Sequence, residues 1–258
     1  MDLGLEGKRV LVTGGSKGIG LACARAFLAE GAKVGIVSRS QANIDTALAD
    51  LPGAVGHAAD LTDAAAALDI VQAMEEKLGP LDVLVNSAGA AKRTPAPELT
   101  PEAWRGAMDA KFFSYINVID PLIKLMAARG KGVVVNVIGN GGKVASPTHL
   151  AGGAANAALM LATAGLGSAY AASGVRVLAV SPGLTNTGRV AQGLASEARL
   201  QGITVEEAGA RAVARIPMGR WAEPEEIANA VLFLASQKAS YLTGVSIPMD
   251  GASVPVVI

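Results

Sequence analysis

The sequence predicts an α/β protein built on one doubly wound parallel sheet of about seven strands, with helices on both faces. Short apolar runs typical of buried strands alternate with segments whose apolar residues recur at helical spacing. The connections between these segments are short, so we expect right-handed crossovers and parallel strands. The 258 residues, 51% of them apolar, contain no linker, which favours a single domain over residues 1–258.

Local patterns predict the individual elements. A first helix, over residues 18–30, ends at Gly31, because glycine is favoured just beyond a helix C-terminus. A long helix begins after Thr100, which is a capping residue followed by a proline and an acid. Other helices are expected after the third strand, over residues 151–172 and from Pro224 onward. The strands are expected at residues 8–12, 33–37, 54–59, 81–85, 133–137, 175–180 and 246–249.

Composition narrows the classes of partner. The 22 basic and 22 acidic residues give a formal charge of zero, and no basic stripe is present, so we expect no nucleic-acid or membrane partner. No apolar run approaches the roughly 18 residues of a membrane span, and no secretory signal is present, so we expect a cytoplasmic protein. Cys23 shares an apolar helix face with Ile19, Ala22 and Ala26, which indicates a core residue. We expect no metal site.

The turn between the first strand and the first helix contains more glycines than packing requires. Gly14 and Gly15 can take backbone angles closed to other residues, while Gly18 and Gly20 let the first helical turn approach a pyrophosphate. Free N–H groups and the positive helix end then face the anion. The alternative is a structural turn without a ligand. The string from Thr13 to Gly20 resembles the cofactor loop of the short-chain dehydrogenase/reductase family.

The end of the second strand carries cations and no carboxylate. An acid there would accept from a free ribose 2′-hydroxyl, whereas a cation would pair with a 2′-phosphate. This sequence has Ser38, Arg39 and Ser40 at that place and Lys17 in the glycine loop. A charge-assisted bond from Arg to phosphate contributes about 1.5–3 kcal/mol, a preference of roughly one to two orders of magnitude. We therefore favour NADP(H) over NAD(H), the alternative being two solvated surface cations.

Further motifs extend the resemblance from Gly4 to about Gly251. Asp60 and Leu61 resemble the family's adenine-contacting pair. The run from Asn86 to Gly89 resembles its Asn-Asn-Ala-Gly motif, in which Asn86 would stabilise the sheet and Gly89 would make room for the cofactor. By this resemblance, the residues expected to bind cofactor are Gly14, Ser16, Lys17, Gly18, Ile19, Gly20, Ser38, Arg39, Asp60, Leu61, Asn86, Ala88, Gly89, Lys111, Pro182, Gly183, Thr185 and Thr187.

The resemblance also implies an atypical active site. Members of the family transfer hydride between a nicotinamide and a carbonyl, alcohol or C=C bond. They usually do so with an Asn, a Ser and a Tyr-x-x-x-Lys pair, in which Tyr moves the proton while Lys lowers its pKa and holds the nicotinamide ribose. Those four places hold Lys111, Gly139, Gly152 and Asn156 here. None of the usual four side chains is present.

Asn and Lys have exchanged places, so an ammonium is retained. Lys111 shares a helix face with Trp104, Met108 and Tyr115, a largely apolar stripe where an unpaired lysine is unusual. We expect Lys111 to act in the site. The alternative is that its stem lies along this face while its head reaches water.

His149 lies seven residues before Asn156, the Tyr-to-Lys spacing of enoyl-acyl carrier protein reductases, a branch of this family that residues 137–160 resemble without a gap. Histidine exchanges protons near neutral pH, so His149 is a catalytic candidate, with a loop or cap residue as the alternative. Gly139 and Gly152 leave space for a substrate, and Asn140 is a candidate hydrogen-bond donor to its carbonyl oxygen.

These residues predict an NADP(H)-dependent oxidoreductase acting on a small molecule. A conjugated enone or enoyl substrate is favoured over a simple ketone, because the enolate can be protonated later by water. The alternatives are a silent NADP(H)-binding sensor or partner subunit and, less favoured, a lyase or isomerase. Lys92 and Arg93 either meet an anionic substrate or lie in a solvated loop. Residues 186–215 cover the substrate in the family and look polar and irregular here, and the resemblance implies a homotetramer or dimer.

Overall fold

The computed structural model describes residues 1–89 and 91–256, apart from the side chain of residue 192. Seven parallel strands form one sheet in the order β3-β2-β1-β4-β5-β6-β7, which confirms the predicted fold class. The strand order reverses direction between β1 and β4. The strands are β1 (Arg9–Thr13), β2 (Lys33–Ser38), β3 (Val55–Ala58), β4 (Val83–Asn86), β5 (Gly132–Val137), β6 (Val175–Pro182) and β7 (Ser246–Met249).

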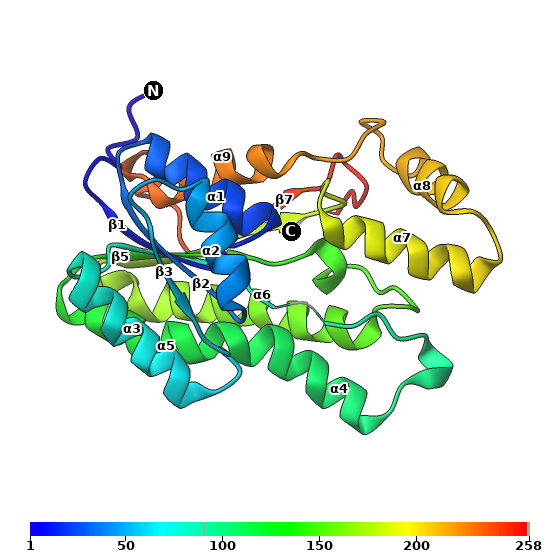
Figure 1. Cartoon of the computed structure of the whole chain (residues 1–258), viewed down its shortest axis with the longest axis horizontal. Coiled ribbons are helices and arrows are strands. Elements are labelled where there is room, and N and C mark those ends of the chain that lie inside the picture. Colours follow the sequence, from blue (N-terminus) through cyan, green and yellow to red (C-terminus); the bar gives the residue numbers. More distant parts are fainter. Residues whose placement is uncertain (90, 257–258) are drawn as a thin grey trace.

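Helices cover both faces of this sheet (Figure 1). One face is covered by α1 (Gly18–Ala29), α2 (Gln41–Ala49) and α9 (Pro224–Ala235). The opposite face is covered by α3 (Ala64–Leu78), α5 (Ser114–Ala128) and α6 (Leu150–Tyr170). The chain enters α5 through α4 (Pro101–Ala107) and a π-helical segment, η2 (Met108–Phe113).

A hydrophobic core on each face of the sheet explains why the strands are apolar at consecutive positions. Val10 and Val12 pack under α1 and α9, whereas Leu11 between them packs under α3 and α5. A parallel sheet buried on both faces needs apolar residues at consecutive positions, and this produces the continuous runs in the sequence. Cys23 is fully buried in the first core, as predicted, and this burial raises the pKa of its thiol to about 12.

Two segments bear on the expectations about helices. The segment Leu150–Ser173 is long and apolar enough to cross a membrane by length and composition only. In the fold it contains α6, which packs against β6 and η2. Residues 186–215 were expected to be irregular, yet they form α7 (Gly188–Gln201) and α8 (Val205–Ala214), which pack together at one end of the molecule (Figure 1). A capping box of Thr204 and Glu207 starts α8.

Candidate active site

The glycine loop after β1 packs too tightly for side chains. A Cβ atom on Gly14, whose φ is 67°, would lie 2.7 Å from the Ser87 carbonyl oxygen, and one on Gly20 would overlap the carbonyl oxygen of Gly14. The loop lies at the carboxyl ends of β1 and β4, where the strand order reverses and ligands bind in such sheets. The N-terminus of α1 supplies free N–H groups there.

A buried polar chain supports this loop. Thr13 Oγ1 donates to Asn86 Oδ1 at 3.2 Å, Asn86 Nδ2 donates to Asn136 Oδ1 at 3.0 Å, and Asn136 Nδ2 donates to Thr163 Oγ1 at 3.1 Å. The backbone N–H of Ala88 also donates to Thr13 Oγ1 at 3.3 Å. Asn86 therefore ties β1 to β4 and β5, and because it is fully buried, its side chain holds the sheet together and does not face a ligand.

The loop after β4 also packs closely, in this case against the backbone of η2. Gly89 has φ 78°, and a Cβ atom there would overlap the carbonyl oxygen of Ala110. A side chain at residue 89 therefore cannot be accommodated while η2 keeps its place, so Gly89 makes room for the backbone at Ala110, and its role toward a cofactor stays a prediction.

The residues predicted to bind the adenosine part of the cofactor lie near the carboxyl end of β2. Ser16 Oγ donates to Ser38 Oγ at 2.9 Å, which ties the glycine loop to this strand. Lys17 and Arg39 are both exposed, and within the described residues neither forms an ion pair. Asp60 turns its carboxylate back to Thr62, at 3.0 Å from the backbone nitrogen.

Two of the expected cofactor residues offer little side chain to a ligand. Leu61 is 5% exposed and belongs to the core, and Thr185 is 4% exposed, so each would contact a ligand through its backbone. The segment after β6 nevertheless reaches the glycine loop, because a Cβ atom on Gly18 would lie 3.2 Å from Thr187 Cγ2. Gly183 packs against Asp250, while Pro182 ends β6, and Ile19 lies in the first turn of α1.

Lys111 points inward from η2. Its Nζ donates to Tyr115 Oη at 2.6 Å and to the Val137 carbonyl oxygen at 3.0 Å, at the end of β5. The ammonium also lies 4.3 Å from the centre of the Tyr115 ring. The head therefore does not extend into bulk water, and one of its three N–H bonds has no partner among these contacts. Trp104, predicted on the same buried face, is 39% exposed, because the π-helical turn changes the register of the helix.

The surroundings of Lys111 favour loss of its proton near neutral pH. Burial, with the positive charge of Arg189 as a smaller cause, lowers the pKa of Lys111 to about 7. Burial raises the pKa of Tyr115, so its phenol stays neutral, and Tyr115 Oη donates to the Val137 carbonyl at 2.8 Å. In this cluster Lys111 is the group that can gain or release a proton at physiological pH.

The His149 ring occupies the space beside Gly152. His149 is the residue before α6, and a Cβ atom on Gly152 would overlap its Cε1 atom and lie 2.6 Å from its Nε2. Its Nδ1 is buried and has no hydrogen-bond partner in the part of the chain that the structure describes. Burial first, then the charges of Arg93, Arg189 and Lys111, lower the pKa of His149 to about 4. This corrects the expectation of proton exchange near neutrality, because the ring is neutral at pH 7 and offers hydrogen bonds only.

Asn156 lies next to Gly139 and Gly141. It is 5% exposed, and its Nδ2 lies 3.4 Å from the position of a Cβ atom on Gly139 and 3.7 Å from one on Gly141. Its Oδ1 has no hydrogen-bond partner. Asn140 is half-buried in the short helix η3 (Asn140–Gly142) beside it. The structure thus brings Asn156, His149 and the glycines at 139, 141 and 152 together.

Sequence reasoning missed Arg189. This residue lies in the first turn of α7, and its charge acts on both Lys111 and His149. No local motif marks it, because the folding of α7 brings it to the site. The capping box of Thr204 and Glu207 was a readable signal that this region is helical.

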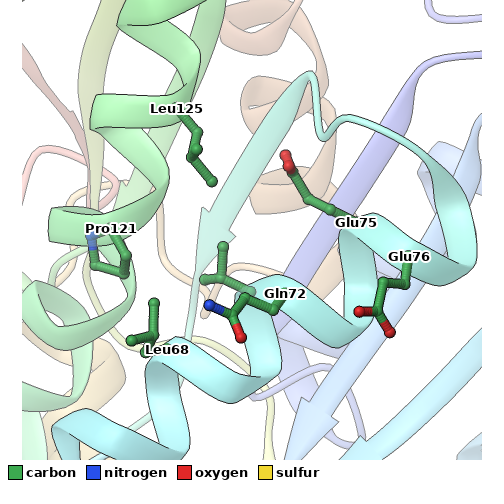
Figure 2. Close-up of a pocket in the computed structure, with 7 residues that line it drawn as sticks. Leu68, Gln72, Glu75, Glu76, Pro121 and Leu125 are labelled. Carbon is green, nitrogen blue, oxygen red and sulfur yellow. The ribbon is translucent and has the colours of Figure 1, made fainter.

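A hollow between α3 and α5 is a different feature (Figure 2). Its lining includes Glu75, which accepts from the Leu81 N–H at 2.9 Å and pairs with Arg129 at 2.8 Å. Because Leu81 precedes β4, this hollow lies toward the amino ends of the strands, away from the glycine loop. We therefore assign the site to the opposite end of the sheet.

Comparison with known proteins identifies the family. A family model described as enoyl-(acyl carrier protein) reductase matches residues 14–252. The chain belongs to the short-chain dehydrogenase/reductase family. It is 37% identical over 252 residues to 2-(S)-hydroxypropyl-CoM dehydrogenase 3 of Xanthobacter autotrophicus, covering 96% of each chain. It is 34% identical over 259 residues to 3alpha-hydroxysteroid dehydrogenase of Mediterraneibacter gnavus, covering 98% of this chain and 99% of the relative.

Solved structures agree with this assignment. A variant of actinorhodin polyketide ketoreductase crystallised with NADPH superposes with a TM-score of 0.94 and 30% identity, covering 97% of this chain and 98% of that one. Family membership and these relatives support a nicotinamide-dependent oxidoreductase. The side-chain-free glycine cradle at the β1 and β4 ends fits a dinucleotide.

Proposed function

We propose that the protein is an NADP(H)-dependent oxidoreductase with a non-standard site in which Lys111 handles the proton. Its substrate is a small conjugated enone or enoyl compound, or another carbonyl compound. The observation that carries the proposal is the inward Lys111 ammonium, bonded to Tyr115 Oη and the Val137 carbonyl at the end of β5. A proton donor works best when its pKa lies near the working pH, as the pKa of about 7 for Lys111 does.

The roles of the neighbouring residues follow from their free atoms. The bound nicotinamide would supply or accept the hydride. The remaining N–H of Lys111 is available to a ribose hydroxyl or to a substrate oxygen that becomes negative. Asn156 Oδ1 and His149 Nδ1 would orient the substrate, because both atoms are buried and have no hydrogen-bond partner among the described residues. Reduction of a conjugated C=C bond places the negative charge on an enolate oxygen, which suits an ammonium donor.

The preference for NADP(H) rests on Lys17, Ser38 and Arg39. Ser38 is held against the glycine loop by Ser16, and Arg39 is exposed beside it without an ion-pair partner in the described part of the chain. An arginine at this place is suited to a 2′-phosphate. The neighbouring carboxylate, Asp60, is engaged with Thr62.

A second candidate function is an NADP(H)-binding sensor or partner subunit without turnover. The observation that favours it is the replacement of both usual hydroxyl places by Gly139 and Gly152. We also propose that the chain acts in the cytoplasm as a homotetramer or dimer. Leu161 on α6 is 76% exposed, and Tyr241, in the turn after the short helix that follows α9, is fully exposed, so both are candidates for subunit contacts. Sedimentation equilibrium would determine the assembly.

Two measurements test the enzyme proposal. NADPH fluorescence on titration with protein should show binding at micromolar concentration and weaker binding of NADH. Oxidation of NADPH should then be measured with matched enones and ketones, of which the enones should react faster. Failure to bind NADPH would end both candidate functions, whereas binding without turnover on any compound would favour the sensor.

A further inference from the structure

Two arginines from distant segments meet on one face of α7. Arg93 belongs to the loop after β4, and its Nε lies 3.4 Å from the position of a Cβ atom on Gly193. Gly193 follows Arg189 by four residues on α7, and residues at this spacing share a helix face. The absence of a side chain at residue 193 therefore lets the Arg93 guanidinium lie on the same face of the helix as Arg189.

The protein provides no visible counter-charge for this pair. Among the described residues, no ion pair or side-chain hydrogen bond involves Arg93 or Arg189. Both side chains are exposed, and the partial desolvation of Arg189, with the charge of Arg93 as a smaller cause, holds the pKa of Arg189 below its ordinary value. Two like charges placed together repel, so the arrangement favours an anion that would neutralise both.

This cationic pair faces the substrate side of the site. Arg93 and Arg189 both act on His149, and Arg189 also acts on Lys111. The His149 ring lies against Gly152, and Asn156 lies next to Gly139 and Gly141, so the charges of the pair act on groups that adjoin these glycines. An anion bound by the pair would hold the rest of a small molecule close to these groups.

We propose that Arg93 and Arg189 form an anion clamp that selects a substrate carrying a carboxylate, phosphate or sulfonate group. The inference rests on the proposed function and names the substrate class of that site. A guanidinium binds such groups through two parallel N–H bonds, and two guanidiniums on one helix face can grip one anion from two sides. The same chemistry would suit a cofactor phosphate, because Thr187, just before α7, touches Gly18, so the test must separate the two sources.

The test compares β-acetylacrylate, a conjugated enone with a carboxylate, with its methyl ester. Binding of each to the full-length protein is measured by calorimetry with NADP+ present at saturation, so that the dinucleotide cradle is filled. The carboxylate should bind at least about tenfold more tightly than the ester. In Arg93→Ala and in Arg189→Ala this ratio should fall toward one, whereas Arg199→Ala, farther along α7, should keep it.

Three results would overturn the clamp: equal affinity of the wild-type protein for acid and ester, equal losses for both compounds in the arginine variants, or a loss confined to NADP+ affinity. The last result would assign the pair to the cofactor. The proposed function fails separately, through absence of NADPH binding. In that case inorganic phosphate is titrated into the ligand-free protein, and the clamp predicts weaker binding in both arginine variants, whereas unchanged binding contradicts it.

Discussion

The cofactor half of the site, at the carboxyl ends of β1 and β4, and the substrate half, beyond β5, differ in how many of their buried polar atoms have hydrogen-bond partners within the protein. At the carboxyl ends of β1 and β4, Thr13, Asn86 and Asn136 are buried and hydrogen-bonded to one another. Beyond β5, three buried atoms have no hydrogen-bond partner among the described residues: His149 Nδ1, Asn156 Oδ1 and Nζ of Lys143, the residue that follows η3. Unpaired buried polar atoms are costly, so they mark places where a ligand supplies the partner. Trp221 Nε1 and Asp250 Oδ2, the latter beside Gly183, are also buried without a partner among the described residues. The polar chain at β1, β4 and β5 is therefore satisfied within the protein, whereas the atoms after β5 and Asp250 are not.

The cofactor half and the substrate half also differ in the side chains that they contain. The glycine loop keeps a backbone-only cradle, which tolerates no side chain. The substrate half has glycine at residues 139 and 152, and the charges of Arg93, Arg189 and Lys111 act on a neutral His149. Proton handling has therefore moved from a hydroxyl to a buried amine in our account.

The largest effect on ligand binding is expected from Gly20→Ala, which changes the glycine loop of the cofactor half. The new Cβ would overlap the Gly14 carbonyl oxygen, so the loop cannot keep its shape, and NADPH binding should be lost at micromolar protein. Gly106→Ala is the matched control, because nothing lies within 4 Å of its Cβ position in α4, and it should stabilise that helix by about 0.5–1 kcal/mol. NADPH fluorescence and thermal unfolding measure both. Normal NADPH binding by the Gly20 variant would show that the cradle is not the cofactor site.

Lys111→Met should lower turnover by about 10²–10⁴-fold, because a positioned proton donor contributes about that factor. The folded state should survive, since Tyr115 Oη still donates to the Val137 carbonyl. Lys124→Met on the exposed surface of α5 is the control. Single-turnover kinetics with the best enone measures the effect. Equal rates in the Lys111 variant and the wild type would remove Lys111 from the mechanism.

Arg39→Ala should reduce the preference for NADPH over NADH by roughly one to two orders of magnitude, the worth of a charge-assisted bond to phosphate. The ratio of the two dissociation constants is the quantity to measure, with Arg105→Ala on the exposed face of α4 as the control. An unchanged ratio would leave Arg39 as a solvated surface residue.

The smallest effect concerns acid stability. Burial lowers the pKa of His149 from 6.5 to about 4, so as the pH falls from 6.5 toward 4 the unfolded chain binds this proton before the folded chain does. The contribution of His149 to stability should therefore decrease over that window. Urea unfolding at pH 7, 5.5 and 4 should show a smaller decrease for His149→Gln than for the wild type. Parallel decreases would mean that His149 titrates in the folded protein at its ordinary pKa.

The sequence was a good guide to the sheet and a poorer guide to the substrate half. Every strand was predicted within a few residues, because a parallel sheet buried on both faces needs continuous apolar runs. The glycine loop was readable because its constraint is local. Residues 186–215 were wrongly expected to be irregular, because the amphipathic pattern of α7 and α8 is short and polar. The capping box of Thr204 and Glu207 nevertheless indicates the start of a helix.

Long-range contacts account for what the sequence could not provide. The meeting of Arg93 with Gly193 joins residues one hundred positions apart. The low pKa of His149 depends on burial and on charges from three other segments, none of which its own neighbours reveal. The π-helical turn that aims Lys111 at Val137 has no sequence signature that we could read, and it moved Trp104 away from the predicted face.

The central claim, that Lys111 is the proton-handling group of the site, is tested most directly by NMR titration of its side-chain nitrogen, assigned by comparison with Lys111→Met. The account predicts a pKa near 7 for Lys111 and a change in its resonance when NADP+ binds. A pKa close to the ordinary lysine value of 10.5, with no response to NADP+, would contradict it.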